Sequence, residues 1–199
     1  MHLKLFLIPI IAAFPFCAAH FLLAQAVPAA KDGSQSLAIG GGLSSYDVDW
    51  GHGRMLGATV WADYTPGWLP ARLRGLGIEA EARDISLDPS SSQSSNFREA
   101  TAGGGPIYFW RHFRNFHPYG KGNASFGVMN FRIPNTTYDH DSRTVFSAGV
   151  GFEYRAYRNV WARADYEYQA WPDFFGGKTM DPQGFTVGAS YHFSRPHLH

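Results

Sequence analysis

Apolar and polar residues alternate with a period of two along most of the chain, and clusters of Gly, Pro, Ser, Asn and Asp interrupt this alternation. A period of two is typical of a β-strand with two different faces, and the spacing of an amphipathic helix is nearly absent. Each alternating stretch has about the 9–11 residues with which a tilted strand crosses a membrane. The eight stretches cover approximately residues 36–46, 54–64, 75–85, 98–110, 118–129, 144–155, 160–170 and 183–193. The pattern predicts an all-β fold, an eight-stranded antiparallel up-and-down barrel that crosses a membrane.

In seven of these stretches, one face carries most of the large apolar residues and the other carries small or charged residues. If the apolar faces point outward, they meet lipid. The residues expected on that surface include Leu37, Ile78, Val150 and Val187. Residues 98–110 have apolar side chains on both faces, so the pattern leaves the phase of the fourth strand open.

The alternation alone also fits a soluble barrel of the lipocalin type, in which the apolar face points inward. The polar face, however, is rich in Gly, Ala, Ser and Thr, which suits the cramped interior of an eight-stranded barrel better than a soluble exterior. Aromatic residues gather near both ends of the expected strands, as they do at the two membrane interfaces. They are Tyr64, Tyr108, Trp110, Tyr154, Tyr191 and Phe193 at one end, and Trp50, Tyr166, Tyr168 and Trp171 at the other. A soluble periplasmic lipocalin-like binding barrel remains the alternative.

The first 26 residues have the features of a cleaved signal peptide. A basic start with Lys4 precedes an apolar run over residues 5–16, which is too short to span a bilayer as a helix. Ala24 and Ala26 give the small residues of a cleavage site, so cleavage is expected after Ala26. Cys17, the only cysteine, leaves with this segment, and no disulfide or thiol chemistry is expected. The expected organisation is a signal peptide over 1–26, a short lead over 27–35, an outer-membrane barrel over 36–193 and a tail over 194–199.

Composition narrows the function classes. Charged residues make up 17% of the chain, against roughly 25% in typical soluble domains. The 17 Lys and Arg residues nearly balance the 16 Asp and Glu residues, so no nucleic-acid partner is expected. No metal is expected, because a hairpin tip explains Asp47, Asp49 and His52 better than a metal site does. No phosphate-bearing cofactor is expected either, because Gly-rich stretches such as residues 103–105 lie inside strands and lack the helix that a phosphate loop requires.

The connections between the expected strands alternate in character. Those that follow odd-numbered strands are polar and cover residues 47–53, 86–97, 130–143 and 171–182. Those that follow even-numbered strands cover residues 65–74, 111–118 and 156–159. Outer-membrane barrels have longer extracellular loops and short periplasmic turns. The first set is therefore expected outside the cell and the second in the periplasm.

Most charged residues of the strands share the face that the barrel would enclose. Buried charges cost several kcal/mol each, by order of magnitude, unless they are paired, so these residues are expected to form an ion-pair network that fills the lumen. They are Asp63, Glu79, Glu81, Arg83, Lys121, Glu153, Arg155, Arg163, Asp165 and Glu167. A narrow pore, gated by exchange of ion-pair partners, is the alternative use of such a lumen.

The last strand carries outward-facing apolar residues and ends in an aromatic one, like the C-terminal signal that the barrel-assembly machinery reads during insertion. The residues of this insertion signal are Phe185, Val187, Tyr191 and Phe193. Residues 118–122 (PYGKG), 149–155 (GVGFEYR) and 165–168 (DYEY) resemble the fifth, sixth and seventh strands of the opacity/OmpA-like family of small outer-membrane β-barrels. The resemblance covers nearly the whole mature chain and leaves no residues for a peptidoglycan-binding domain. It implies an integral outer-membrane protein, in contact with outer-membrane lipid, with a structural or surface-interaction role and an extracellular ligand that the sequence does not name.

One group of residues resembles a catalytic site. His140, Ser142 and Glu153 resemble the His, Ser and Glu of lipid A deacylases, which are also eight-stranded outer-membrane barrels. A hydroxyl, a base and an orienting carboxylate are what ester hydrolysis needs. The residues around them do not resemble that family, and a solvated loop explains Asp139 to Ser142 better. We therefore expect no enzymatic activity, with a deacylase-like hydrolase as the alternative.

Overall fold

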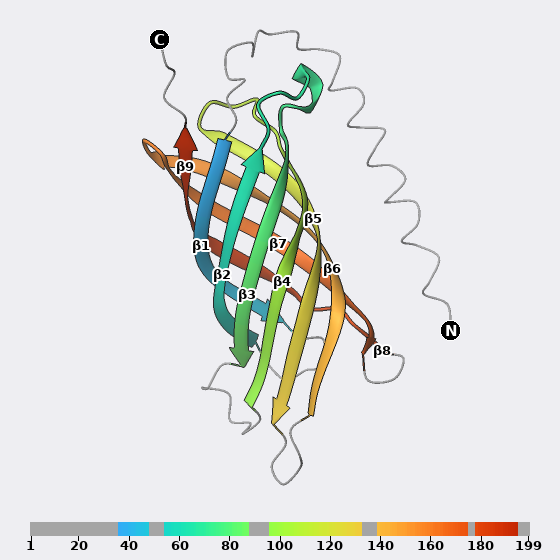
Figure 1. Cartoon of the computed structure of the whole chain (residues 1–199). Helices are drawn as coiled ribbons and strands as arrows, with labels where there is room; N and C mark the ends of the chain where they lie inside the picture. Colours follow the sequence, from blue (N-terminus) through green and yellow to red (C-terminus); the bar gives the residue numbers. More distant parts are fainter. Residues whose placement is uncertain (1–35, 48–53, 88–95, 133–138, 175–177, 195–199) are drawn as a thin grey trace, which may run out of the picture. The chain divides into compact units, whose positions relative to one another are not determined.

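The computed structural model describes residues 36–47, 54–87, 96–132, 139–174 and 178–194. The expected signal peptide, the lead over 27–35 and all but the first residue of the expected tail lie outside the described residues. The described part contains one short 3-10 helix, η1 (Ala71–Leu73), and nine strands (Figure 1). These are β1 (Ser36–Asp47), β2 (Arg54–Thr65), β3 (Leu76–Leu87), β4 (Asn96–Phe109), β5 (Phe116–Arg132), β6 (Asp139–Tyr157), β7 (Val160–Phe174), β8 (Lys178–Met180) and β9 (Gln183–Ser194).

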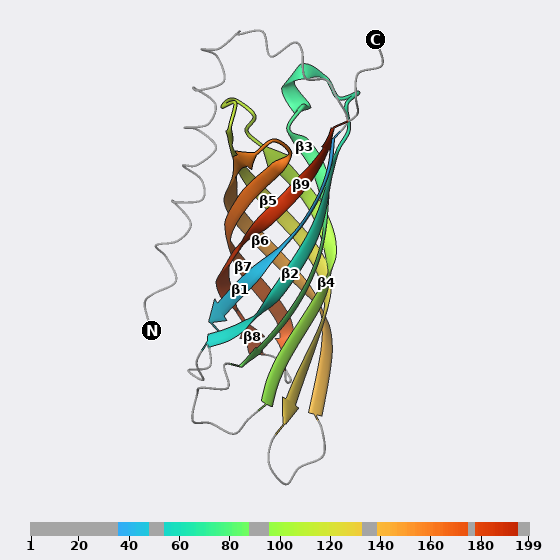
Figure 2. The same ribbon diagram turned by 90° about the vertical axis from the view of Figure 1, so that its left-hand side faces the viewer.

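The eight long strands close into one antiparallel barrel, as the alternation predicts (Figure 2). Strands β1 to β7 pair in sequence order, and β9 pairs with both β7 and β1. The short strand β8, which lies within an expected connection, pairs only with the end of β7, where Trp171 faces Met180. No helix in the described ranges is long and apolar enough to cross a membrane.

Inward-facing and outward-facing residues alternate along every long strand. Leu37, Ile78, Val150 and Val187 lie on the exterior, with exposed fractions between 40% and 64%. In water such a surface would be costly, because it continues around the barrel, whereas in lipid it needs no cover.

The structure also settles the phase of the fourth strand. Glu99, Thr101 and Ile107 are buried in the lumen, whereas Arg98 and Pro106 face outward. The sequence left this phase open because both faces carry apolar residues: Phe97, Ile107 and Phe109 on the inner face, and Ala, Pro and Tyr108 on the outer face.

Strands β4, β5 and β6 are longer than expected at the end that carries the longer connections, here called the loop end. Figure 2 shows them extending past the ends of β1 and β2. Beyond the apolar band the outer face is polar, for example at the exposed ion pair between Arg98 on β4 and Asp84 on β3. The expected loops over 86–97 and 130–143 are correspondingly shorter, because both sides of each loop continue as paired strand.

The opposite end, here called the turn end, carries three connections that the structure describes in full. They follow β2, β4 and β6, and the last is a tight turn in which Arg158 has a positive φ of 37°. Ser36 and Ser194, the first and last described residues, pair with each other at this end. Short periplasmic turns are typical of outer-membrane barrels, so we expect the turn end in the periplasm.

Candidate functional site

The barrel interior holds the densest cluster of polar side chains, and Arg163 on β7 lies at its centre. Its Nη1 lies 2.9 Å from Asp63 Oδ2, its Nε lies 3.4 Å from Asp165 Oδ2, and its Nη2 donates to Glu79 Oε2. The side chain is 1% exposed. One guanidinium therefore joins carboxylates from β2, β3 and β7 across the lumen.

Lys121 and Arg83 extend this cluster toward the loop end. Lys121 Nζ lies 2.5 Å from Glu81 Oε2, 3.0 Å from Glu167 Oε2 and 3.2 Å from Glu79 Oε1. Arg83 lies 2.6 Å from Glu81 Oε1 and 2.8 Å from Glu167 Oε1. The resulting connected set, called here the lumenal network, consists of Asp63, Glu79, Glu81, Arg83, Lys121, Arg163, Asp165 and Glu167.

Aromatic rings cover the cations of the lumenal network. The Arg163 guanidinium lies 4.6 Å from the ring centre of Trp61 and 4.5 Å from that of Tyr119. The Tyr119 hydroxyl accepts from Arg163 Nε at 2.6 Å and donates to Asp165 Oδ2 at 2.8 Å. The Trp61 indole can lie there because Gly40 opposite has no side chain, and a Cβ at Gly40 would overlap the ring. Cation–π contacts and hydrogen bonds thus supplement the ion pairs.

Two charged residues expected in the lumen lie outside the lumenal network. Arg155 is exposed, and its Nε donates to the carbonyl of Arg158 at 2.7 Å. The expectation for Arg155 is wrong because the β6–β7 register shifts just after this residue, where the strand gives way to the turn. Glu153 does face the lumen, but its carboxylate contacts Ser190 and His192.

The contacts of Glu153 bring a Ser, a His and a Glu together at the turn end. Ser190 Oγ lies 3.1 Å from Glu153 Oε1 and 3.3 Å from His192 Nε2. His192 Nε2 also lies 3.3 Å from Glu153 Oε2. In a catalytic triad, the hydroxyl and the carboxylate contact different ring nitrogens. Here one nitrogen faces both, so the arrangement is not that of a triad.

The loop end of the lumen is mainly apolar, with Glu99 as a buried charge, and the alternation pattern did not predict this. A cluster of side chains from seven strands, called here the lumenal plug, fills it. Its members are Tyr46, Met55, Ile85, Leu87, Met129, Val145, Trp171 and Met180. Trp171 is fully buried, so its expected place among the outer aromatic residues is wrong. The sequence does contain a signal for the lumenal plug. On β2, β3, β5 and β7 its members lie an even number of residues from the lumenal charges of the same strand, and therefore on the same face.

Two contacts join the lumenal plug to the lumenal network, one through Gln169 and one between the Arg83 guanidinium and the Tyr46 ring, 4.2 Å from its centre. Trp171 Nε1 donates to Gln169 Oε1 at 2.9 Å, and Gln169 Nε2 lies 3.4 Å from Glu167 Oε1. The indole occupies space that a Cβ at Gly127 would fill. Trp171 therefore packs in space left free by the missing side chain of Gly127, and its indole N–H has a hydrogen-bond acceptor.

Aromatic side chains also narrow the lumen at the turn end. Ile107, Phe109 and Tyr119 form a buried apolar cluster. Beside it, the Trp161 ring lies between two histidines, 4.6 Å from His117 and 5.0 Å from His192 between ring centres. The lumenal network thus lies between apolar side chains at both ends, and Glu153, Ser190 and His192 lie among those at the turn end.

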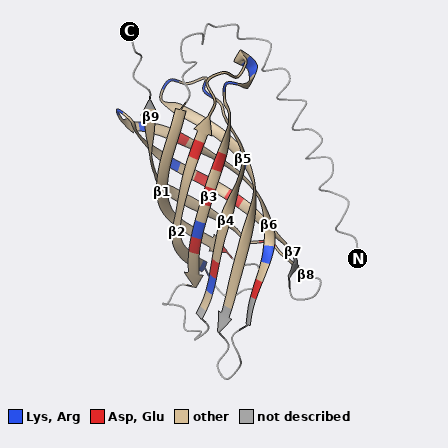
Figure 3. Ribbon diagram, viewed as in Figure 1, with Lys and Arg blue, Asp and Glu red and all other residues tan. Residues whose placement is uncertain are grey.

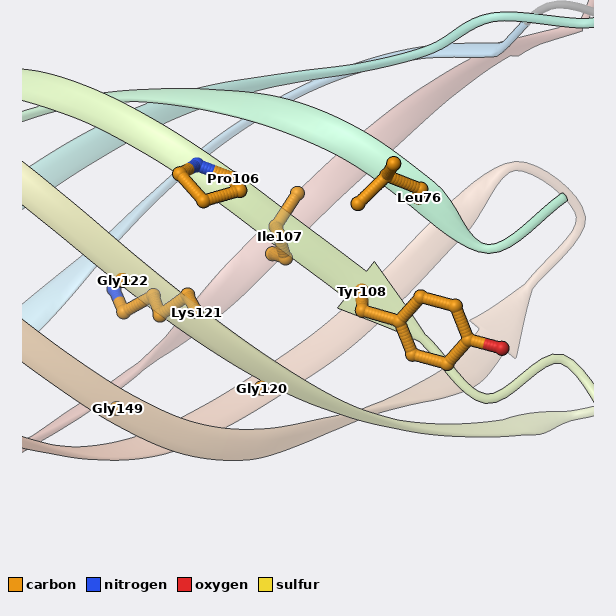
Figure 4. Close-up of a pocket in the computed structure, with 8 residues that line it drawn as sticks. All are labelled: Leu76, Pro106, Ile107, Tyr108, Gly120, Lys121, Gly122 and Gly149. Atoms are coloured by element: carbon orange, nitrogen blue, oxygen red, sulfur yellow. The ribbon is translucent and has the colours of Figure 1, made fainter. Parts of the chain in front are cut away.

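A depression of about 330 Å³ lies on the outer wall of the barrel. Outward-facing Leu76, Pro106 and Tyr108 line it together with the backbone of Gly120 and Gly122 (Figure 4). Small residues on β4 and β5 account for this hollow in the lipid-facing surface.

The structure separates the residues of the deacylase-like group. Ser142 is exposed on the outer face of β6, whereas Glu153 is buried on its inner face near the other end. Strands rise about 3.3 Å per residue, so the two lie roughly 35 Å apart along β6. Ser142 and Glu153 therefore cannot act on the same ester.

The four residues of the expected insertion signal all face outward on β9. Tyr191 and Phe193 lie next to each other, with ring centres 4.8 Å apart.

Phe193→Ala should lower the amount of folded barrel in the outer membrane several-fold, measured by the heat-modifiable shift on gels. Phe126→Ala removes the same ring from the outer face of β5, where it is 59% exposed and outside the insertion signal, and serves as control. Equal assembly of wild type and Phe193→Ala would rule out this role for Phe193.

Comparison with known proteins identifies the family. Residues 16–193 match the family model described as outer membrane protein beta-barrel domain. Comparison with curated proteins gave no match.

Solved structures of small barrels are similar to this chain. Neisserial surface protein A (NspA) is 15% identical, with 81% of this chain and 97% of that chain covered and a TM-score of 0.61. Ail, the attachment invasion locus protein of Yersinia pestis, solved in complex with the heparin analogue sucrose octasulfate, is 18% identical, with 80% and 99% covered and a TM-score of 0.56. OprG of Pseudomonas aeruginosa is 13% identical, with 80% and 96% covered and a TM-score of 0.54.

At such low sequence identities these structures show only that the fold is shared. The match to the family model shows that the chain belongs to the family. The resemblance to small outer-membrane barrels that the strand motifs suggested is thereby confirmed. A closed eight-stranded barrel, an apolar exterior and a family match over most of the chain together establish that this protein belongs to the outer membrane protein β-barrel family.

Proposed function

We propose that this protein is a non-conducting integral outer-membrane barrel with a structural or surface-interaction role. Family membership supports the outer-membrane location. The observation that carries the rest is the filled lumen, in which the lumenal network lies between apolar side chains at both ends. Such an interior supports a rigid scaffold and leaves the loop end as the surface that meets other molecules.

The lumenal network suits a fixed structural element better than a gate. Arg163, Lys121 and Arg83 each contact at least two carboxylates, and each is at most 1% exposed in its side chain. Opening a pore by exchange of partners would leave buried charges transiently unpaired, at a cost of several kcal/mol each by order of magnitude. The lumenal plug adds a second obstacle, because its apolar side chains do not replace the water around a passing ion.

The extended ends of β4, β5 and β6 support the surface-interaction role. They carry polar outward-facing residues beyond the apolar band, including Arg98, which pairs with Asp84 of β3. Binding residues are often found on loops that a rigid scaffold positions. The partners we propose are an extracellular ligand at the loop end, outer-membrane lipid around the barrel and the assembly machinery during insertion.

Conductance measurements test the closed lumen. Purified barrel inserted into planar lipid bilayers should give no stable conductance steps, because the lumen is filled along its length. A general porin inserted in the same way provides the positive control. Reproducible steps from the wild-type barrel would contradict the proposal and favour a pore. Unaltered lipid A acylation in a deletion strain, measured by mass spectrometry, would agree with a non-enzymatic role.

A further inference from the structure

The turn end has a charge distribution unlike the rest of the chain. Its three connections and the strand residues next to them cover residues 65–75, 110–116 and 155–159 and are called here the turn-end collar. They contain no Asp or Glu, whereas the whole chain has 16 such residues. In Figure 3 these connections are blue and tan without red. Their arginines are Arg72, Arg74, Arg111, Arg114, Arg155 and Arg158.

Exposed aromatic side chains lie among these arginines. Trp68 is 80% exposed, Tyr157 is 67% exposed, and Trp110 and Phe113 are each more than half exposed. Large apolar side chains gathered on the surface of a protein mark a contact with a membrane or a partner. The turn-end collar is therefore both strongly basic and strongly aromatic.

The position of the turn-end collar indicates its partner. It directly follows the outer apolar band, which at this end finishes in the exposed rings of Tyr64, Tyr154 and Phe193. Residues just past such a band lie at the depth of the lipid headgroups. Tryptophan and tyrosine favour that interface, and guanidinium groups bind phosphate through paired hydrogen bonds.

We propose that the turn-end collar binds the anionic phospholipid headgroups of the leaflet in which the turn end lies. The exposed arginines supply charge complementary to the phosphates, and Trp68, Trp110 and Tyr157 enter the boundary of the acyl chains. A cell-wall polymer is also anionic, but it offers no apolar region for these rings. The inference rests on the outer-membrane setting of the proposed function and is independent of whether the lumen conducts.

Native mass spectrometry of the folded barrel tests this lipid preference. The barrel is released from detergent containing equal amounts of phosphatidylglycerol and phosphatidylcholine with the same acyl chains. The variant Arg72→Gln/Arg114→Gln/Arg158→Gln removes three exposed charges of the turn-end collar. Each arginine near an anionic surface contributes about 1 kcal/mol, or about fivefold. The wild type should retain mainly phosphatidylglycerol, and the ratio of the two bound lipids should fall at least about fivefold in the variant.

A matched variant at the loop end separates the turn-end collar from total charge. Arg54→Gln/Arg98→Gln/Arg143→Gln removes the same number of arginines and should keep the wild-type ratio. Equal retention of both lipids by the wild type, or an equal fall in both variants, would overturn the proposal. A wild type without lipid preference that co-sediments with purified cell-wall sacculi through these arginines would overturn it in favour of a cell-wall partner. A conducting barrel that still prefers phosphatidylglycerol would contradict only the proposed closed lumen.

Discussion

Replacing Arg163 with Met should lower the free energy of unfolding by about 3–5 kcal/mol, the range for removing one partner of a buried ion pair. The substitution leaves Asp63, Glu79 and Asp165 without their shared cation in a part of the lumen where all three are buried. It also removes the ring contacts with Trp61 and Tyr119. Urea titration in detergent micelles, followed by circular dichroism and the gel shift of the folded barrel, measures the change.

The exposed pair between Arg98 and Asp84 provides the matched control. Both side chains are at least half exposed, so water screens the pair. Arg98→Met should therefore change the free energy of unfolding by less than about 1 kcal/mol. A loss that small for Arg163→Met would show that the lumenal charges are hydrated, and it would contradict the tightly paired network.

Trp171→Ala should be nearly as destabilising, with a loss of about 3–5 kcal/mol. The indole is fully buried among the apolar side chains of the lumenal plug. Its removal leaves a cavity that the surrounding strands cannot close, because they are fixed in the hydrogen-bonded barrel. It also leaves Gln169 without the donor that its Oε1 accepts from.

Trp68→Ala is the control for the loss of a tryptophan side chain. Trp68 is 80% exposed at the turn end, so its removal should change the free energy of unfolding by no more than about 0.5 kcal/mol. The same urea titration applies to both variants. A Trp171→Ala barrel as stable as Trp68→Ala would mean that the lumenal plug packs loosely or contains water.

The strands and their faces could be predicted because burial on one side of a sheet imposes a period of two. The ends of β4, β5 and β6 could not be predicted as well. Their outward-facing residues beyond the apolar band, such as Arg98 and Ser142, are polar and look like loop residues. In the structure these stretches pair as strand, and inward-facing Phe97 at the added end of β4 packs against the lumenal plug.

The period of two also predicted that most charged residues of the strands face the lumen, but it could not predict which of them pair with each other. Nothing in the sequence says that Arg163 contacts Glu79, because the stagger of the strands decides which side chains lie at the same height. Arg155 was predicted wrongly because it lies where β6 ends in a turn, and there side chains no longer alternate between the two faces of the sheet. Glu99 was missed because the faces of the fourth strand could not be told apart.

The contacts across the lumen join residues that are far apart along the chain. Arg83 and Glu167 are 84 residues apart, and so are Arg163 and Glu79. Each pair links β3 to β7, strands that are not neighbours in the sheet. These side chains meet only when β9 has paired with both β1 and β7, so they add nothing to a half-formed barrel. Interactions that form after the rate-limiting step slow unfolding and leave the rate of folding unchanged. The charges inside this barrel therefore act chiefly on its lifetime in the membrane once it has closed.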